Sequence, residues 1–257
     1  MRFWLFRLGL LGFAALVGLL FAEVTLRLSG VSYPRVTQRH DFRGTAYRPN
    51  VQWAQSDEGY AQIRTNSVGF RDQDWTIAKP DGTRRIAVLG DSYVDAVQVE
   101  EPARFTEQIG VALAPCRAGG GQSLQVMNFG QSGYGTAQEL MTYRHDVSTY
   151  SPDLVILAFL SHNDLRNNSQ RLQGDPGRPC FHLVDDQLTF DDSFRTSSFH
   201  VQPWWKRLFN AGRDHLRLLQ LANETRQSLS GRAELARRQQ VASALLEDTP
   251  DDAEIGL

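Results

Sequence analysis

Three short apolar runs constrain the fold of this chain more than any other feature of its sequence. They lie in segments 84–90, 124–130 and 153–160, and each is typical of a buried β-strand. The segments between them, 101–114 and 135–150, are typical of helices. Strand, helix, strand, helix and strand at this spacing predict an α/β fold with a parallel sheet.

Local signals support this alternation. Pro102 falls in the expected first turn of segment 101–114, where a missing N–H costs nothing. Thr136, followed three residues later by Glu139, predicts a capping box at the start of the second helix. The third apolar run is continuous from 154 to 160, which predicts a strand covered on both faces.

A small polar cluster follows each of the three strands. The first strand ends in Gly-Asp-Ser at residues 90–92, the second continues into "NFGQSGYG" at 128–135, and the third into "SHND" at 161–164. Parallel strands place their carboxyl ends along one edge of the sheet, where α/β proteins gather their functional groups. The three clusters are therefore expected to converge on one rim.

Three residues of these clusters form a candidate site for nucleophilic catalysis. Ser92 at a strand end is the candidate nucleophile, and its own N–H is a candidate oxyanion donor. Gly133 allows close backbone approach to a substrate oxygen, and the side-chain amide of Asn163 can donate to that oxygen. Each residue alone is more often an ordinary turn residue. Their order at successive strand ends is what favours a site.

Together these blocks resemble the SGNH/GDSL hydrolase superfamily, over about residues 60–170. "GDSY" is similar to its first block, which implies that Ser92 is the nucleophile. "NFGQSGYG" and "HND" are similar to its second and third blocks, which implies that Gly133 and Asn163 complete the oxyanion hole. The resemblance implies a flavodoxin-like α/β/α sandwich with a parallel sheet.

The resemblance also implies an activity. It predicts a serine esterase or O-acyl (acetyl) hydrolase that needs no metal and no organic cofactor, with a small-molecule or glycan ester in the cell envelope as substrate. "TNSVGFRD" and the N-terminal apolar segment resemble a bacterial, membrane-anchored branch of the superfamily. Some relatives instead transfer acyl groups to envelope polysaccharides, so an O-acyltransferase is an alternative.

The sequence departs from the family at its fourth block, Asp-x-x-His, which supplies the base and its orienting carboxylate. No Asp stands three residues before any of the six histidines, and Asp214 directly precedes His215. Only three of the family's usual five strands are predicted. The simplest interpretation is a C-terminally incomplete fold that lacks the catalytic histidine; the alternative is that His200 or His215 substitutes for it.

This departure keeps a non-enzymatic function open. An inactive module that binds an acylated glycan or a protein partner would keep the pocket without the base. A nucleotide-binding fold of the same class is disfavoured, because "GDSYVDA" lacks the G-x-G-x-x-G phosphate cradle. The net charge of −2 gives no indication of nucleic-acid binding.

The N-terminal segment 1–30 predicts a membrane anchor. Arg2 and Arg7 come first, and residues 8–22 then carry no charge. The positive-inside rule places the bulk of such a chain outside the cytoplasm, in the periplasm or on the cell surface. The alternative is a cleaved signal peptide and a secreted protein, although no clear A-x-A site follows.

Further regions follow from composition. We expect a connector with accessory strands at 31–83, the hydrolase-like core at 84–200, basic helices at 201–246 and a disordered tail at 247–257. The basic helices predict either a solvated amphipathic pair or a surface that faces anionic lipid. "CFHLVDDQLTF" predicts a short hairpin. Cys116 and Cys180 show no zinc-binding spacing with the histidines, and either a disulfide between them or two free thiols is compatible with the sequence.

Overall fold

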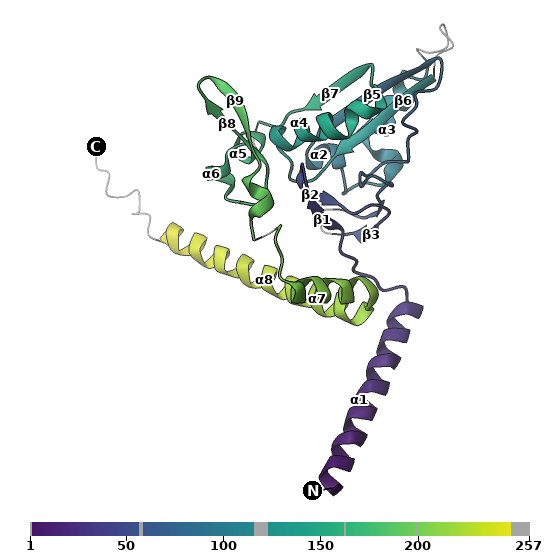
Figure 1. Cartoon of the computed structure of the whole chain (residues 1–257), viewed down its shortest axis with the longest axis vertical. Coiled ribbons are helices and arrows are strands. Elements are labelled where there is room, and N and C mark those ends of the chain that lie inside the picture. Colours follow the sequence, from purple (N-terminus) through teal and green to yellow (C-terminus); the bar gives the residue numbers. More distant parts are fainter. Residues whose placement is uncertain (1, 57–58, 116–122, 162, 199, 248–257) are drawn as a thin grey trace, which may run out of the picture. The chain divides into compact units, whose positions relative to one another are not determined.

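The computed structural model describes residues 2–56, 59–115, 123–161, 163–198 and 200–247 (Figure 1). The chain forms two compact units. One comprises Met1–Tyr33 with Phe209–Leu257, and the other comprises Pro34–Leu208. Each unit is described by itself below.

The larger unit is built on a parallel sheet of three strands. These are β5 (Thr83–Gly90), β6 (Ser123–Gly130) and β7 (Leu154–Ala158), and they lie in the order β6-β5-β7. The register sets Gly90 beside both Gly130 and Ala158, so the three carboxyl ends are level. The predicted α/β fold with a parallel sheet is confirmed, and so is the common rim.

Alternating strand residues pack into two core clusters, one on each face of the sheet. Ile86, Val88 and Val126 pack with Val94 of the short helix α2 (Ser92–Asp95) and with Ile109 of α3 (Phe105–Leu113). The opposite face packs against the 3₁₀ turn η3 (Val147–Tyr150). The cluster on this face consists of Phe70, Ala87, Leu89, Met127, Phe129, Val147 and Tyr150. Period-two alternation therefore fills both faces of β5 and β6.

The prediction that the third strand is covered on both faces is wrong. Strand β7 lies at the edge of the sheet, and Leu154, Leu157 and Phe159 are between 45% and 52% exposed. Only Ile156 and Ala158 pack against a core cluster, on the α3 side. The sequence run is apolar on both faces, but in the described chain nothing covers the second face at this edge.

The two predicted helices form with altered starts. Residues Glu101–Ala103 form the 3₁₀ turn η1 around Pro102, and α3 begins only at Phe105. Helix α4 (Thr136–His145) is capped by Gly135, whose N–H donates to the Gln138 side chain at 3.2 Å. The predicted Thr136–Glu139 capping box is therefore wrong.

Small antiparallel hairpins and short helices complete the larger unit. The hairpins are β1 (Thr37–His40) with β2 (Gly44–Tyr47), β3 (Gln52–Gln55) with β4 (Ala61–Arg64), and β8 (Cys180–Val184) with β9 (Gln187–Asp191). The short helices are α5 (Asp164–Asn167), α6 (Gln170–Gln173) and η4 (Ser193–Thr196). The first two hairpins lie in the predicted accessory region. The third confirms the hairpin that "CFHLVDDQLTF" predicts.

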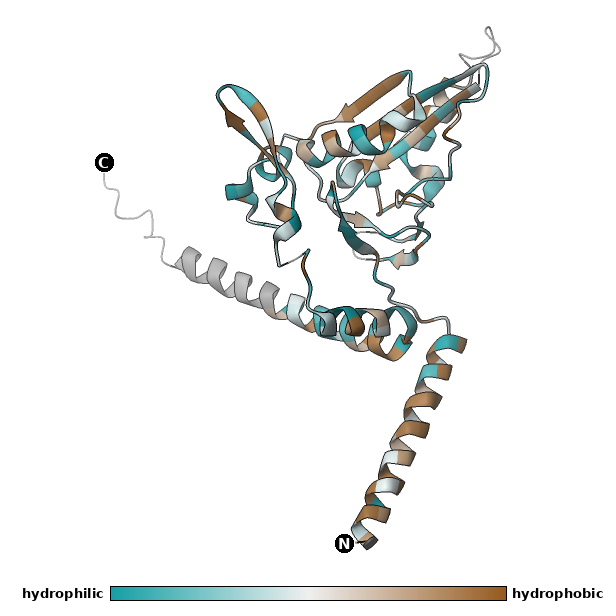
Figure 2. Ribbon diagram, in the orientation of Figure 1, coloured by the Kyte–Doolittle hydropathy of each residue, from teal (hydrophilic) through white to brown (hydrophobic). Residues whose placement is uncertain are grey.

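The smaller unit is helical. Helix α1 (Arg2–Leu28) is mostly apolar, with hydrophilic residues toward its C-terminal end (Figure 2), and residues Phe3–Leu28 form one candidate membrane span. Helix α8 (Arg217–Glu247) begins beside its end, after α7 (Trp204–His215). An N-terminal helix of this kind is compatible with a membrane anchor or a signal peptide.

A buried carboxylate joins α1 to α8. The two oxygens of Glu23 accept from the backbone N–H groups of Arg217 and Leu218, each at 3.0 Å. Glu23 also binds Arg27 at 2.8 Å, and the backbone N–H of Tyr33 donates to Gln220. A side chain of α1 thus satisfies the first N–H groups of α8, which have no partner within their own helix.

Candidate functional site

The Gly-Asp-Ser turn ends strand β5 and starts helix α2. A Cβ on Gly90 would lie 2.3 Å from Val94 Cγ2, so glycine allows α2 to fold back onto the strand. Asp91 is the N-cap of α2, and its Oδ1 accepts from Tyr93 N at 2.9 Å. Ser92 is therefore the first residue of a one-turn helix at the rim.

The side chain of Ser92 is accessible from the surface at this rim. The residue is partly exposed, and its Oγ makes no hydrogen bond within the part of the chain that the structure describes. Its backbone N–H makes none either within those residues. A free hydroxyl beside a free N–H suits a nucleophile that supplies one of its own oxyanion donors.

Asn163 lies directly against this turn. Its side-chain amide donates to Asp91 Oδ2 at 2.5 Å, although 72 residues separate the two in sequence. Asp164, the next residue, accepts from Leu160 N at 2.6 Å and so closes the turn after β7. The amide carries two hydrogens, so one remains for a substrate oxygen after Asp91 takes the other.

Gly133 lies in the loop after β6 with φ +80°, a conformation that favours glycine. The loop is fixed to the first turn, because Gln131 N donates to Gly90 O at 3.1 Å. The carbonyl oxygen of Gly133 accepts from Arg178 Nη1 at 2.5 Å, while its N–H makes no hydrogen bond among the described residues. The structure thus holds the Gly133 loop beside the strand end that carries Ser92.

Asp95 is a residue of this rim that sequence reasoning missed. It is fully buried, and its Oδ2 accepts from Ser132 Oγ at 2.5 Å, from Ser132 N at 3.0 Å and from Tyr47 Oη at 2.6 Å. Burial raises the pKa of this carboxyl, and the hydrogen bonds oppose that shift. Asp95 ties helix α2 to the Gly133 loop. The only sequence signal was an Asp in an otherwise apolar turn.

Glu139, Asp164 and Asp91 form a cluster of carboxyl groups near the Gly-Asp-Ser turn. Glu139 of α4 is buried, and neither of its oxygens has a hydrogen-bond partner among the described residues. Burial, together with the nearby carboxylates of Asp164 and Asp91, raises the pKa of Glu139 to about 8. The side chain is therefore protonated over most of the physiological range, and the fold holds a neutral acid beside two carboxylates.

A cavity of about 220 Å³ adjoins the Gly133 loop. Arginines, hydroxyl groups and amides dominate its lining, which is made up of Thr37, Arg43, Thr45, Tyr47, Gln131, Ser132, Tyr134, Gln138 and Arg178. Arg178, the second residue that the sequence did not indicate, both lines this cavity and holds Gly133 O. The exposed wall of the cavity is nevertheless mostly apolar, so it can contact both polar and apolar parts of a ligand.

The two histidines that the sequence offered as substitute bases have other surroundings. His200 packs edge-on against Phe194, with ring centroids 5.1 Å apart, and its Nε2 lies 3.4 Å from His40 O. His215 ends helix α7 in the smaller unit. Neither contact is to Ser92, and no base is assigned to either residue.

Three other histidines are placed as follows. Burial lowers the pKa of His40 to about 4, and Arg43 adds to this effect. His145 stacks on Phe42 with ring centroids 3.7 Å apart, and His182 lies on hairpin β8–β9. His162, like Cys116, lies outside the described residues, so the Cys116–Cys180 pairing stays a prediction.

No model of a known protein family matches the chain, and no curated protein sequence matches it either. The sequence motifs and the geometry of the rim therefore define the candidate site.

Proposed function

We propose that this chain is a serine ester hydrolase of the SGNH/GDSL type, with Ser92 as nucleophile. The observation that carries the proposal is the unengaged Ser92 hydroxyl at the end of the central strand, with Asn163 tied to the same turn through Asp91 at 2.5 Å. The proposal joins this geometry to the three sequence blocks that resemble the superfamily. We also propose a flavodoxin-like fold. The strand order β6-β5-β7 supports it, because it corresponds to 2-1-3, the start of the flavodoxin-like order.

The proposed reaction is acyl transfer to water. Ser92 Oγ attacks the ester carbonyl carbon, and its proton passes to a base. The oxyanion that forms accepts hydrogen bonds from the N–H groups of Ser92 and Gly133 and from the amide of Asn163. The intermediate collapses with loss of the alcohol, and water then releases the acid from the acyl-enzyme. Transfer of the acyl group to a sugar hydroxyl instead of water would make the chain an O-acyltransferase.

The substrate class follows from the cavity next to Gly133. Its two arginines and several hydroxyl groups could bind the polar part of an acylated glycan, and its mostly apolar exposed wall could contact the acyl group. The proposed location is outside the cytoplasm and on the membrane, with α1 as an uncleaved anchor. The bonds from Glu23 to the start of α8 support retention of α1, because cleavage would remove the cap.

The test is covalent labelling of the full-length, detergent-solubilised protein with a fluorophosphonate. Ser92 Oγ would form a bond to phosphorus as fluoride leaves, and intact mass would show one adduct. We expect labelling of the native chain and none of Ser92→Ala. Ser148→Ala is the matched control, because this exposed serine of η3 bonds Arg144 O and belongs to none of the three rim motifs, and we expect it to be labelled as the native chain is. Labelling of Ser92→Ala at the native rate would refute the assignment of the nucleophile.

A second candidate function is a binding module without turnover. It is favoured by the same hydroxyl, which has no base beside it within the described residues, and by the missing Asp-x-x-His block. Folded protein that binds an acylated glycan, resists labelling and hydrolyses no ester would support this function. Ester hydrolysis that depends on Ser92 would exclude it.

A further inference from the structure

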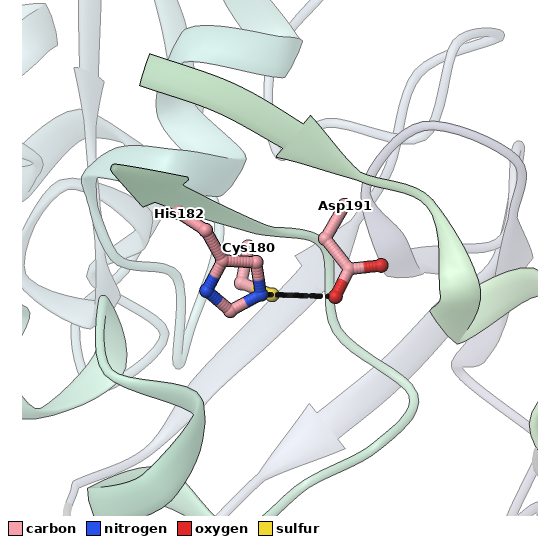
Figure 3. Close-up of side chains that lie close together, drawn as sticks. All are labelled: Cys180, His182 and Asp191. Atoms are coloured by element: carbon pink, nitrogen blue, oxygen red, sulfur yellow. Dashed lines mark hydrogen bonds and ion pairs between the residues drawn. The ribbon is translucent and has the colours of Figure 1, made fainter. Parts of the chain in front are cut away.

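Hairpin β8–β9 brings a thiol, an imidazole and a carboxylate to one point (Figure 3). His182 Nε2 lies 3.0 Å from Asp191 Oδ2, Cys180 Sγ lies 3.5 Å from His182 Nε2, and Cys180 Sγ lies 3.7 Å from Asp191 Oδ2. Three different donor atoms therefore face one another, with one contributed by each side chain.

The register of the hairpin accounts for this convergence. Cys180 is directly opposite Asp191, and Cys180 and His182 share a face because side chains alternate along a strand. Phe181 and Phe190 occupy the other face, with ring centroids 5.2 Å apart. The two-residue turn at Asp185 and Asp186 has positive φ at both positions, as a type I′ turn requires, and it fixes this register.

The three distances match the edges of a tetrahedron around zinc. Zinc lies about 2.3 Å from a thiolate sulfur, about 2.0–2.1 Å from an imidazole nitrogen and about 2.0–2.2 Å from a carboxylate oxygen. Tetrahedral angles then separate sulfur from either light atom by about 3.6 Å, and nitrogen from oxygen by about 3.4 Å. The observed separations of 3.5, 3.7 and 3.0 Å are each within about 0.4 Å of these values.

The surroundings of the three side chains also suit a metal ion. Ser193 N donates to Asp191 Oδ1 at 2.8 Å, so that carboxylate is oriented with its other oxygen toward Cys180 and His182. The Cys180 side is buried, whereas the His182 side chain is 51% exposed. An ion there would have three protein ligands and one position open to water, the arrangement of many catalytic zinc sites.

A nucleophilic cysteine is the alternative use of such a cluster. Cys180 Sγ lies 3.5 Å from His182 Nε2 and 3.7 Å from Asp191 Oδ2, so it faces both partners and not a single base. His182 Nε2 is also shared with Asp191, and thus all three groups point to a common centre and do not form a relay. This arrangement favours coordination over nucleophilic attack.

We propose that Cys180, His182 and Asp191 bind a zinc ion, with Cys180 as thiolate after its proton passes to solvent. The mixed sulfur, nitrogen and oxygen donor set suits Zn²⁺ and excludes a Mg²⁺ or Ca²⁺ site, because those ions take oxygen ligands. Residue spacing alone does not indicate the site, because its third ligand comes from the opposite strand. The inference is independent of Ser92 and of the proposed hydrolase function.

The experiment is a Co²⁺ titration of the full-length, reduced, detergent-solubilised protein, followed by competition with Zn²⁺. We expect a cobalt–thiolate charge-transfer band and the visible bands of tetrahedral Co²⁺, both removed by one equivalent of Zn²⁺. Cys180→Ser should abolish the charge-transfer band. His182→Gln and Asp191→Asn should each weaken Zn²⁺ binding by more than about 100-fold, the upper end of the loss caused by removing a group that only supports a ligand.

Two control variants make the result specific. Cys116→Ser leaves Cys180 as the sole thiol, so its charge-transfer band must persist. His145→Gln changes a histidine that stacks on Phe42, outside the hairpin, and should bind Zn²⁺ as the native chain does. Circular dichroism establishes that each variant is folded. A folded native chain without the band, a band that survives Cys180→Ser, or unchanged Zn²⁺ affinity in folded His182→Gln would each overturn the proposal.

Discussion

At the scale of single residues, the hydrogen bond between Asp91 and Asn163 organises the candidate site. It joins the turn after the central strand to the turn after β7, and it fixes one hydrogen of the amide that the proposed mechanism needs. Asp91 also caps helix α2 through its other oxygen. One carboxylate therefore positions both the proposed nucleophile and one proposed oxyanion donor.

This pair leads to a prediction about stability. Asp91→Asn and Asn163→Ala should each lower the free energy of unfolding by about 1–3 kcal/mol, because a charge-assisted hydrogen bond between partly buried groups is lost. The double variant should lose less than the sum of the two single losses, since the groups contact each other. Urea unfolding monitored by tryptophan fluorescence measures all three values. Asp81→Asn, an exposed turn residue, is the control, and strictly additive losses would contradict the predicted coupling.

The sequence predicted the three rim residues but not their partners. Ser92, Gly133 and Asn163 could be named because each follows an apolar strand in a short polar motif. Asp95 and Arg178 could not, because their roles depend on contacts with residues at least 37 positions away. The sequence did not predict the cluster of Cys180, His182 and Asp191 for a similar reason. Its geometry follows from the strand register and not from the spacing of the residues.

At the scale of secondary-structure elements, the parallel strands were predictable and their coverage was not. Apolar runs specify a strand wherever one face is buried, and β5 and β6 follow this rule. The run of β7 is equally apolar, yet its position at the sheet edge leaves Leu157 45% exposed. Position within a sheet depends on which other strands are present, which is a property of the whole fold.

Helix α4 provides a pH-dependent prediction, because Glu139 is buried on it. The unfolded chain ionises this carboxyl near its usual pKa of 4.5, whereas the folded protein keeps the proton until about pH 8. The folded state therefore becomes less stable as the pH rises from 4.5 to 8, by ~1.4 kcal/mol for each pH unit at most. Below pH 4.5 this contribution is fully favourable.

Glu139→Gln should remove this dependence. The variant should match the native chain near pH 4.5 and exceed it in stability at pH 8, because the glutamine has no proton to lose. Urea unfolding at several pH values within this window measures the difference. Glu224→Gln removes a carboxylate from helix α8 and should leave the pH profile unchanged. A native profile that remained parallel to that of Glu139→Gln would show that the carboxyl ionises normally.

At the scale of the whole molecule, the N-terminal helix is compatible with a membrane anchor or a signal peptide, and we propose the anchor. We expect the mature protein to keep α1, to remain in the membrane fraction after carbonate extraction and to show an intact mass that includes the N-terminal segment. Glu23→Ala should leave membrane attachment unchanged but increase proteolysis near residue 217, because two N–H groups of α8 lose their partner. Release of a soluble chain that starts after residue 22 would instead establish a cleaved signal.

The position of Glu23 sets the length of the part of α1 that can lie within a bilayer. At a rise of about 1.5 Å per residue, the stretch from Phe3 to Glu23 is about 30 Å long, which equals the hydrocarbon thickness of a typical bilayer. In the proposed anchor, a carboxylate held by the backbone of α8 resists entry into lipid. Arg7 lies within the stretch, near its other end, and its long side chain would reach back to the opposite surface. The hydrogen bonds between Glu23 and α8 would therefore limit how far α1 enters the proposed membrane, and so favour bilayers whose thickness matches this stretch.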